Sequence, residues 1–144
     1  MTVERLRSAT QSRATWLIAY LPLLIGFAAI FVVSGMKNPP VPELLVFRFS
    51  DKLMHAAVYA VIGAFAYRGR LLRSGRSSWA LVWHATLIAA AHGAFDELHQ
   101  YFVPNRSADL FDLLADTLGG GVGAALLHHV TRRLFPSGAM RDQR

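Results

Sequence analysis

The chain has 144 residues and contains no cysteine. This length is typical of a single domain, and the absence of cysteine excludes a disulfide framework, a thiolate metal site and a catalytic thiol. Apolar residues of the set AVILMFWYC make up 53% of the chain and charged residues 17%, which is more apolar than a small soluble domain requires. The same balance excludes intrinsic disorder, which needs low hydrophobicity and a high net charge.

Stretches without charged residues predict helices that cross a membrane. The first stretch, residues 14–36, has 23 residues without Asp, Glu, Lys or Arg, whereas a membrane span needs about 20. This length predicts an uncleaved helix, bent near Pro22, because the apolar part of a signal peptide has only ~7–15 residues. Three further charge-poor windows predict an all-α, polytopic membrane protein with a small bundle of four transmembrane helices. The expected spans are about 14–35, 51–68, 77–97 and 112–131.

The basic residues predict how this bundle is oriented. Eleven of the 15 Lys and Arg residues lie before the first span, in the loop at 68–76 and in the C-terminal tail. The positive-inside rule therefore places both termini in the cytoplasm, with residues 1–13 as an N-terminal segment, 14–131 as one membrane domain and 132–144 as a basic tail. Anionic membrane lipids account for the pI near 10.5, so we expect membrane lipids as partners and no nucleic acid.

Acidic residues gather on the opposite, outer side of the membrane. Seven of the nine acids fall there, although orientation depends little on acidic residues and does not require it. Many of them recur three or four positions apart with other polar residues, which places them on one face of each helix. A charge at mid-membrane costs about 2.5–3.5 kcal/mol, so these polar faces should turn towards one another. On the helical wheel of the third span, Glu97 lies about 140° from His92, so the wheel directs Glu97 away from the polar face that carries His92.

The resulting outer polar cluster has two interpretations. Pairing of Lys52 or Arg106 with the acids would make it a structural plug that holds the bundle together. Seven acids against four bases on this side leave surplus negative charge, which favours a binding site. The predicted binding residues are Asp51, Lys52, His55, Tyr59, His92, Asp96, Glu97, Gln100, Arg106, Asp109, Asp112 and Asp116. Beside them, the spacing Gly119-x-x-x-Gly123 predicts that another helix approaches the last span closely.

Three segments of the chain carry a recognisable pattern. They are DKLMHAAVY at 51–59, HGAFDELHQ at 92–100 and PNRSADLFD at 104–112, the last running into Gly119. In this order and spacing they resemble the VanZ-like family of small bacterial membrane proteins, over about half of the chain. Asp116 departs from the pattern, because the family has Asn there. The resemblance implies a multi-pass protein of the bacterial cytoplasmic membrane and resistance to teicoplanin-type glycopeptide antibiotics through the cell envelope.

Three functions remain open for the cluster. In the first, it binds an envelope component or a glycopeptide-related ligand: Lys52 and Arg106 hold an anionic group, and carboxylates meet polar or amino groups. In the second, the protein is an enzyme acting on a lipid-linked envelope precursor, with His55 or Glu97 as general base and Arg106 as electrostatic stabiliser. In the third, Asp and His side chains relay protons in a transporter. No candidate nucleophile stands out, which favours binding.

Metal binding is not predicted. His92 and Asp96 lie one helical turn apart and could share an ion with His55 or His99. The HExxH spacing of zinc proteases is nevertheless absent, since Glu97 and His99 are in the wrong register. We therefore expect no metal and no cofactor.

Overall fold

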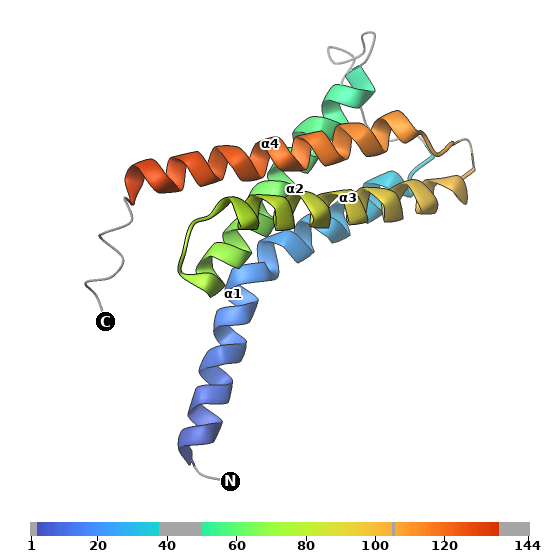
Figure 1. Cartoon of the computed structure of the whole chain (residues 1–144). Helices are drawn as coiled ribbons and strands as arrows, with labels where there is room; N and C mark the ends of the chain where they lie inside the picture. The colour runs from blue at the N-terminus through green and yellow to red at the C-terminus, as the bar shows by residue number, and fades with distance from the viewer. Residues whose placement is uncertain (1–2, 38–49, 105, 136–144) are drawn as a thin grey trace.

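The computed structural model describes residues 3–37, 50–104 and 106–135. They form four helices, α1 (Val3–Ser34), α2 (Ser50–Ser74), α3 (Trp79–Tyr101) and α4 (Leu110–Leu134), which pack as in Figure 1. No strand occurs in these described segments, so the all-α prediction is confirmed. Most of the predicted basic tail, residues 136–144, lies outside the described residues.

Local signals in the sequence explain where the helices end. α2 stops at Ser74 because Gly75 adopts a φ of 65°, the left-handed conformation that commonly closes a helix. α4 begins after Asp109, whose side chain accepts a hydrogen bond from the backbone N–H of Phe111 at 2.8 Å and so caps the helix. α1 runs through Pro22 as one helix, and it changes direction along its length (Figure 1).

α2 and α4 form the most extensive helix contact of the fold. Glycines allow this contact, since their missing side chains let two backbones touch. A Cβ added to Gly119 would collide with the backbone of Ala56, and one added to Gly123 would collide with the carbonyl of Ala60. The close approach predicted from the Gly119-x-x-x-Gly123 spacing is therefore confirmed.

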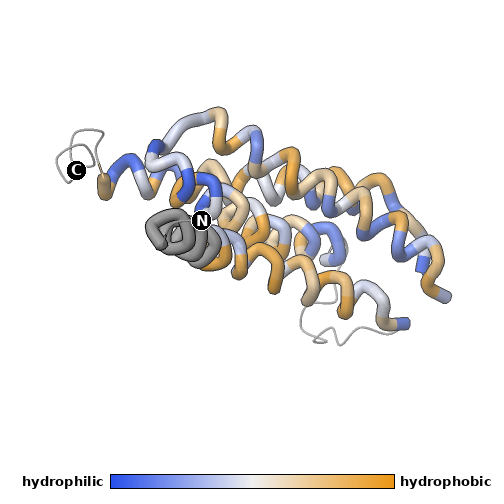
Figure 2. Tube along the Cα trace, turned by 90° about the horizontal axis from the view of Figure 1, so that it is seen from below, coloured by the Kyte–Doolittle hydropathy of each residue, from blue (hydrophilic) through white to orange (hydrophobic). Residues whose placement is uncertain are grey.

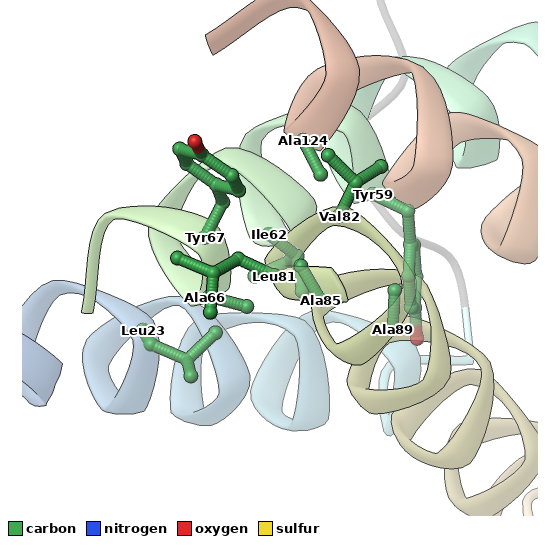
Figure 3. Packing of buried hydrophobic residues seen from close by; sticks show 10 residues of the cluster. All are labelled: Leu23, Tyr59, Ile62, Ala66, Tyr67, Leu81, Val82, Ala85, Ala89 and Ala124. Atoms are coloured by element: carbon green, nitrogen blue, oxygen red, sulfur yellow. The ribbon is translucent and has the colours of Figure 1, made fainter. Parts of the chain in front are cut away.

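Small and aromatic side chains fill the core between the helices. Four of the ten residues of the buried apolar cluster are alanines, and Tyr59 and Tyr67 are its largest members. Figure 3 shows these side chains packed between α1, α2, α3 and α4. The cluster comprises Leu23, Tyr59, Ile62, Ala66, Tyr67, Leu81, Val82, Ala85, Ala89 and Ala124. This tight core holds the polar end of the bundle in place.

Large apolar side chains cover the outside of all four helices. Examples are Ile18 on α1, Val61 on α2, Trp83 on α3 and Leu118 on α4, each more than half exposed. Figure 2 shows that hydrophilic residues lie mostly towards the ends of the helices. Soluble monomers rarely expose contiguous apolar surface on this scale, so the exterior is suited to a lipid environment.

Two of the described helices are long and apolar enough to cross a membrane. They are Thr15–Ser34, with 17% of its apolar window buried, and Leu110–Leu134, with 33% buried. The core helix of a soluble protein would be mostly buried, which these two are not. α2 and α3 do not meet the same criterion, so the bundle of four helices is observed while four membrane spans remain a prediction.

Substitution of Gly123 by Ala should weaken the fold. The new methyl group meets the carbonyl of Ala60, and backbone cannot rotate away as a side chain can. We expect a loss of roughly 1–3 kcal/mol, typical of overpacking, seen as a lower midpoint of thermal unfolding in detergent. Gly121→Ala is the matched control because its Cβ would meet only the Thr86 side chain, at 3.3 Å. Equal midpoints for the two variants would contradict the backbone contact.

Candidate functional site

One end of the bundle brings together the polar faces predicted from the sequence. α2 and α4 begin there and α3 ends there, so residues distant in sequence become neighbours. Exposure falls steeply with depth, from 62% for the Asp51 side chain to 0% for that of Asp116. α2 carries Asp51, Lys52, His55 and Tyr59, α3 carries His92, Asp96, Glu97 and Gln100, α4 carries Asp112 and Asp116, and Arg106 and Asp109 lie just before α4.

Lys52 is the centre of the outer layer of the cluster. Its ammonium lies 2.5 Å from Asp109 Oδ2 and 2.8 Å from Asp112 Oδ1. A third carboxylate, that of Asp51, lies 3.0 Å away. The expected pairing of Lys52 with Asp109 and Asp112 is therefore observed. Because three carboxylates surround this one cation, its charge is compensated within the protein, which argues against the expected use of Lys52 to hold an anionic ligand.

Asp109 has two structural tasks at the start of α4. It caps the helix, and it accepts a hydrogen bond from the Lys52 ammonium. The hydrogen bond from Lys52, followed by that from the Phe111 amide, lowers the pKa of this carboxyl below its ordinary value of 3.8. Asp109 is therefore a permanent anion at neutral pH that ties α4 to α2.

The inner layer of the cluster contains His55, Asp116 and Glu97. His55 Nδ1 lies 2.9 Å from Asp116 Oδ1, and Glu97 Oε2 accepts a hydrogen bond from the backbone N–H of Asp109 at 2.6 Å. Glu97 is buried and contacts the start of α4, so it joins the other predicted residues of the cluster although the helical wheel directs it away from His92. The wheel places it correctly relative to His92, but α4 covers that side of α3 as well.

Three buried carboxylates, those of the inner layer and of the neighbouring Asp96, each keep one oxygen without a hydrogen-bond donor. Asp96 Oδ2 accepts a hydrogen bond from Gln100 Nε2 at 3.0 Å. The second oxygens, Asp96 Oδ1, Glu97 Oε1 and Asp116 Oδ2, are buried and have no hydrogen-bond partner within the described part of the chain. No Lys or Arg of that part forms an ion pair with these three residues either. Buried polar atoms are normally satisfied, so these oxygens indicate a missing partner.

The remaining predicted residues have more local contacts. The Tyr59 hydroxyl lies 2.9 Å from His92 Nδ1, and the His92 ring stacks on Phe27 with 3.9 Å between ring centroids. This pair joins α1, α2 and α3 below the acids. Arg106 Nε donates to the carbonyl of Met36 at 3.4 Å. The expected pairing of Arg106 with an acid is not found among residues 3–37, 50–104 and 106–135.

A second polar network lies at the opposite end of the core and was not predicted. His128 Nδ1 lies 2.9 Å from both the Tyr67 hydroxyl and Ser77 Oγ, and these two oxygens are 2.8 Å apart. His128 is buried, with 1% of its surface exposed. The three residues share no helical spacing, because they lie on α2, α4 and the connection before α3, so no sequence signal links them.

One group of residues in the cluster has the composition of a metal site. His55, Glu97 and Asp116 each offer one ligand atom, and these atoms lie within 4.8 Å of one another. The ligands considered from the sequence spacing are different ones, namely His92 and Asp96 together with His55 or His99. In the structure His92 contacts Tyr59 and Phe27, while the ring of His99 stacks on Phe31.

An all-α chain with an apolar exterior and a buried acidic cluster at one end fits the class of small helical membrane proteins. Comparison with protein families shows a match to the VanZ/LLP1 family over residues 7–132. Because the match extends over most of the 144 residues, the chain belongs to this family and the resemblance seen in the sequence is confirmed. No match was found among curated proteins or among solved structures.

The link between Asp109 and Lys52 should make stability depend on pH. A carboxyl whose pKa is lowered by folding stabilises the protein above its ordinary value of 3.8, and this contribution is lost as the pH falls through the folded-state value. Asp109→Asn keeps the helix cap, because Asn caps as well as Asp, but removes the charge. The difference in unfolding midpoint between wild type and Asp109→Asn should be largest at neutral pH and shrink below about pH 4. A difference that does not change with pH would contradict the ion pair.

Proposed function

We propose that the chain is a multi-pass protein of the bacterial cytoplasmic membrane, with both termini in the cytoplasm, whose outer polar cluster binds a component of the cell envelope. Membership of the VanZ/LLP1 family and the two weakly buried apolar helices support the membrane location. The exposed apolar side chains on all four helices support burial of the whole bundle in lipid. Arginines at 68, 70 and 73, near the end of α2, and Arg76, in the connection to α3, support the proposed orientation.

The free oxygens of the buried carboxylates are the observation that carries the binding function. An ionised carboxylate only accepts hydrogen bonds, so Asp96, Glu97 and Asp116 need donors. Amino and hydroxyl groups of a lipid headgroup or a lipid-linked precursor supply such donors. Asp51 and Asp109 are partly exposed at the outer end, which leaves the cluster approachable from that side. Arg106, whose Nε contacts only a backbone carbonyl among the described residues, can hold an anionic part of the same ligand.

A second candidate function is enzymatic. In the contact of His55 with Asp116, a carboxylate orients an imidazole, as it does for a general base. This arrangement fits a membrane-embedded enzyme acting on a lipid-linked envelope precursor. Turnover of such a precursor by purified protein, lost in His55→Gln, would favour the enzyme, whereas saturable binding without product would favour the binding protein.

The proposed orientation can be tested with single cysteines, because the chain has none of its own. Ser107→Cys lies on the proposed outer side and Ser74→Cys on the proposed cytoplasmic side, and both serines are exposed. A membrane-impermeant maleimide should label Ser107→Cys in intact spheroplasts and label Ser74→Cys only after permeabilisation. The reverse pattern, or labelling of both before permeabilisation, would contradict the topology.

The proposed envelope function extends to resistance against teicoplanin-type glycopeptides. Wild-type protein expressed in a sensitive Gram-positive host should raise the inhibitory concentration of teicoplanin more than that of vancomycin. Asp96→Asn and Arg106→Ala should lose this effect at matched membrane levels, because each removes a group proposed to contact the ligand. His84→Gln, an exposed change on α3 away from the cluster, is the control. Unchanged teicoplanin inhibition with well-inserted wild type would contradict the resistance role.

A further inference from the structure

We propose that His55, Glu97 and Asp116 bind a divalent transition-metal ion at the inner end of the outer polar cluster. One ligand atom from each side chain lies within 4.8 Å of the other two. Imidazole together with two carboxylates suits Zn²⁺ or Mn²⁺, whereas Mg²⁺ and Ca²⁺ prefer oxygen ligands alone. The sequence predicts no metal, so this proposal departs from that expectation.

The burial of two of these side chains points independently to a ligand. Asp116 is 0% exposed and Glu97 is 7% exposed. Each has one oxygen in contact with the protein and a second, buried oxygen without a partner among the described residues. An acceptor left unsatisfied in a buried place costs free energy, and a metal ion at this point would satisfy both oxygens at once.

The distribution of charge also favours a cation here. Lys52 compensates the three carboxylates of the outer layer but forms no ion pair with Glu97 or Asp116. Within the described residues the inner layer therefore has no Lys or Arg beside its carboxylates, and the basic group recorded against Asp116 is the His55 imidazole, itself one of the three proposed ligands. Buried charges are normally paired or coordinate a metal, and a divalent ion supplies the opposite charge that is lacking.

The geometry requires little movement to form the site. Tetrahedral ligands about 2.0–2.2 Å from Zn²⁺ lie roughly 3.5 Å apart, so shifts of about 1 Å suffice. The surroundings already hold the ligands, since the Asp109 amide orients Glu97 through its other oxygen. With three protein ligands, a fourth position stays open for water or for another ligand.

This inference concerns the same inner carboxylates as the proposed function and rests on it in part, because the ion takes the free oxygens of Glu97 and Asp116 and leaves its open fourth position and Asp96 to an envelope component. The ion can nevertheless bind with no envelope component present. The test uses the full chain, purified in detergent with a tag that contains no histidine, stripped with a chelator and dialysed against Zn²⁺ or Mn²⁺. Elemental analysis should find one ion per chain in wild type. Glu97→Gln and His55→Gln should weaken binding by about tenfold or more, and added ion should raise the unfolding midpoint of wild type more than that of either variant.

His84→Gln is the matched control, since it removes an exposed histidine of α3 and should leave binding unchanged. Glu97→Gln keeps an acceptor for the Asp109 amide, so it can fold even if His55→Gln does not. Absence of stoichiometric binding to wild type, with a proton neutralising the carboxylates instead, would overturn the proposal. So would equal weakening in His84→Gln, or undiminished binding in folded Glu97→Gln. None of these results depends on the antibiotic assay, so the metal proposal and the resistance proposal can fail separately.

Discussion

The close parallel contact of α2 with α4 is the constraint on which the rest of the structure depends. Both helices begin at the acidic end, and their contacting residues keep a nearly constant offset along the chain. Lys52 meets Asp109 across 57 residues, His55 meets Asp116 across 61, and Tyr67 meets His128 across 61. Between these polar contacts, glycines and alanines let the two backbones touch. The small residues in the middle thereby set the register of the polar groups at both ends.

The two ends of this helix pair differ in charge, and that difference follows from what surrounds them. The end with Tyr67 and His128 links an imidazole to two hydroxyl groups beside the arginine-rich end of α2, and only His128 Nε2 of this network lacks a partner among the described residues. The other end holds more carboxylates than cations. Its outer layer is satisfied by one ammonium, while its inner layer keeps buried oxygens without donors. These unsatisfied oxygens are the physical basis on which we propose a binding role rather than a purely structural one.

Asp116 shows how one departure from the family pattern changes the site. An Asn at this position could donate a hydrogen bond as well as accept one, whereas Asp adds a charge and only accepts. The carboxylate lies against His55 and leaves its second oxygen buried and unpaired. The Asp116 side chain packs against Gly93 of α3. The missing side chain of Gly93 makes room for it, since a Cβ added there would lie 3.0 Å from Asp116 Cβ. α3 therefore packs against this carboxylate at a glycine.

The sequence by itself determined the helical class, the family, the polar faces and the close approach at Gly119 and Gly123, because these depend on local spacing and composition. It also offered Lys52 and Arg106 as alternative partners of the acids, of which the structure pairs Lys52. Only the tertiary structure decided that Glu97 accepts a hydrogen bond from the backbone at the start of α4, that Arg106 makes no ion pair with the described acids, and that His128 forms a network with Tyr67 and Ser77. A helical wheel gives the direction of a side chain relative to its own helix, whereas the packing of three helices decides which partner lies in that direction.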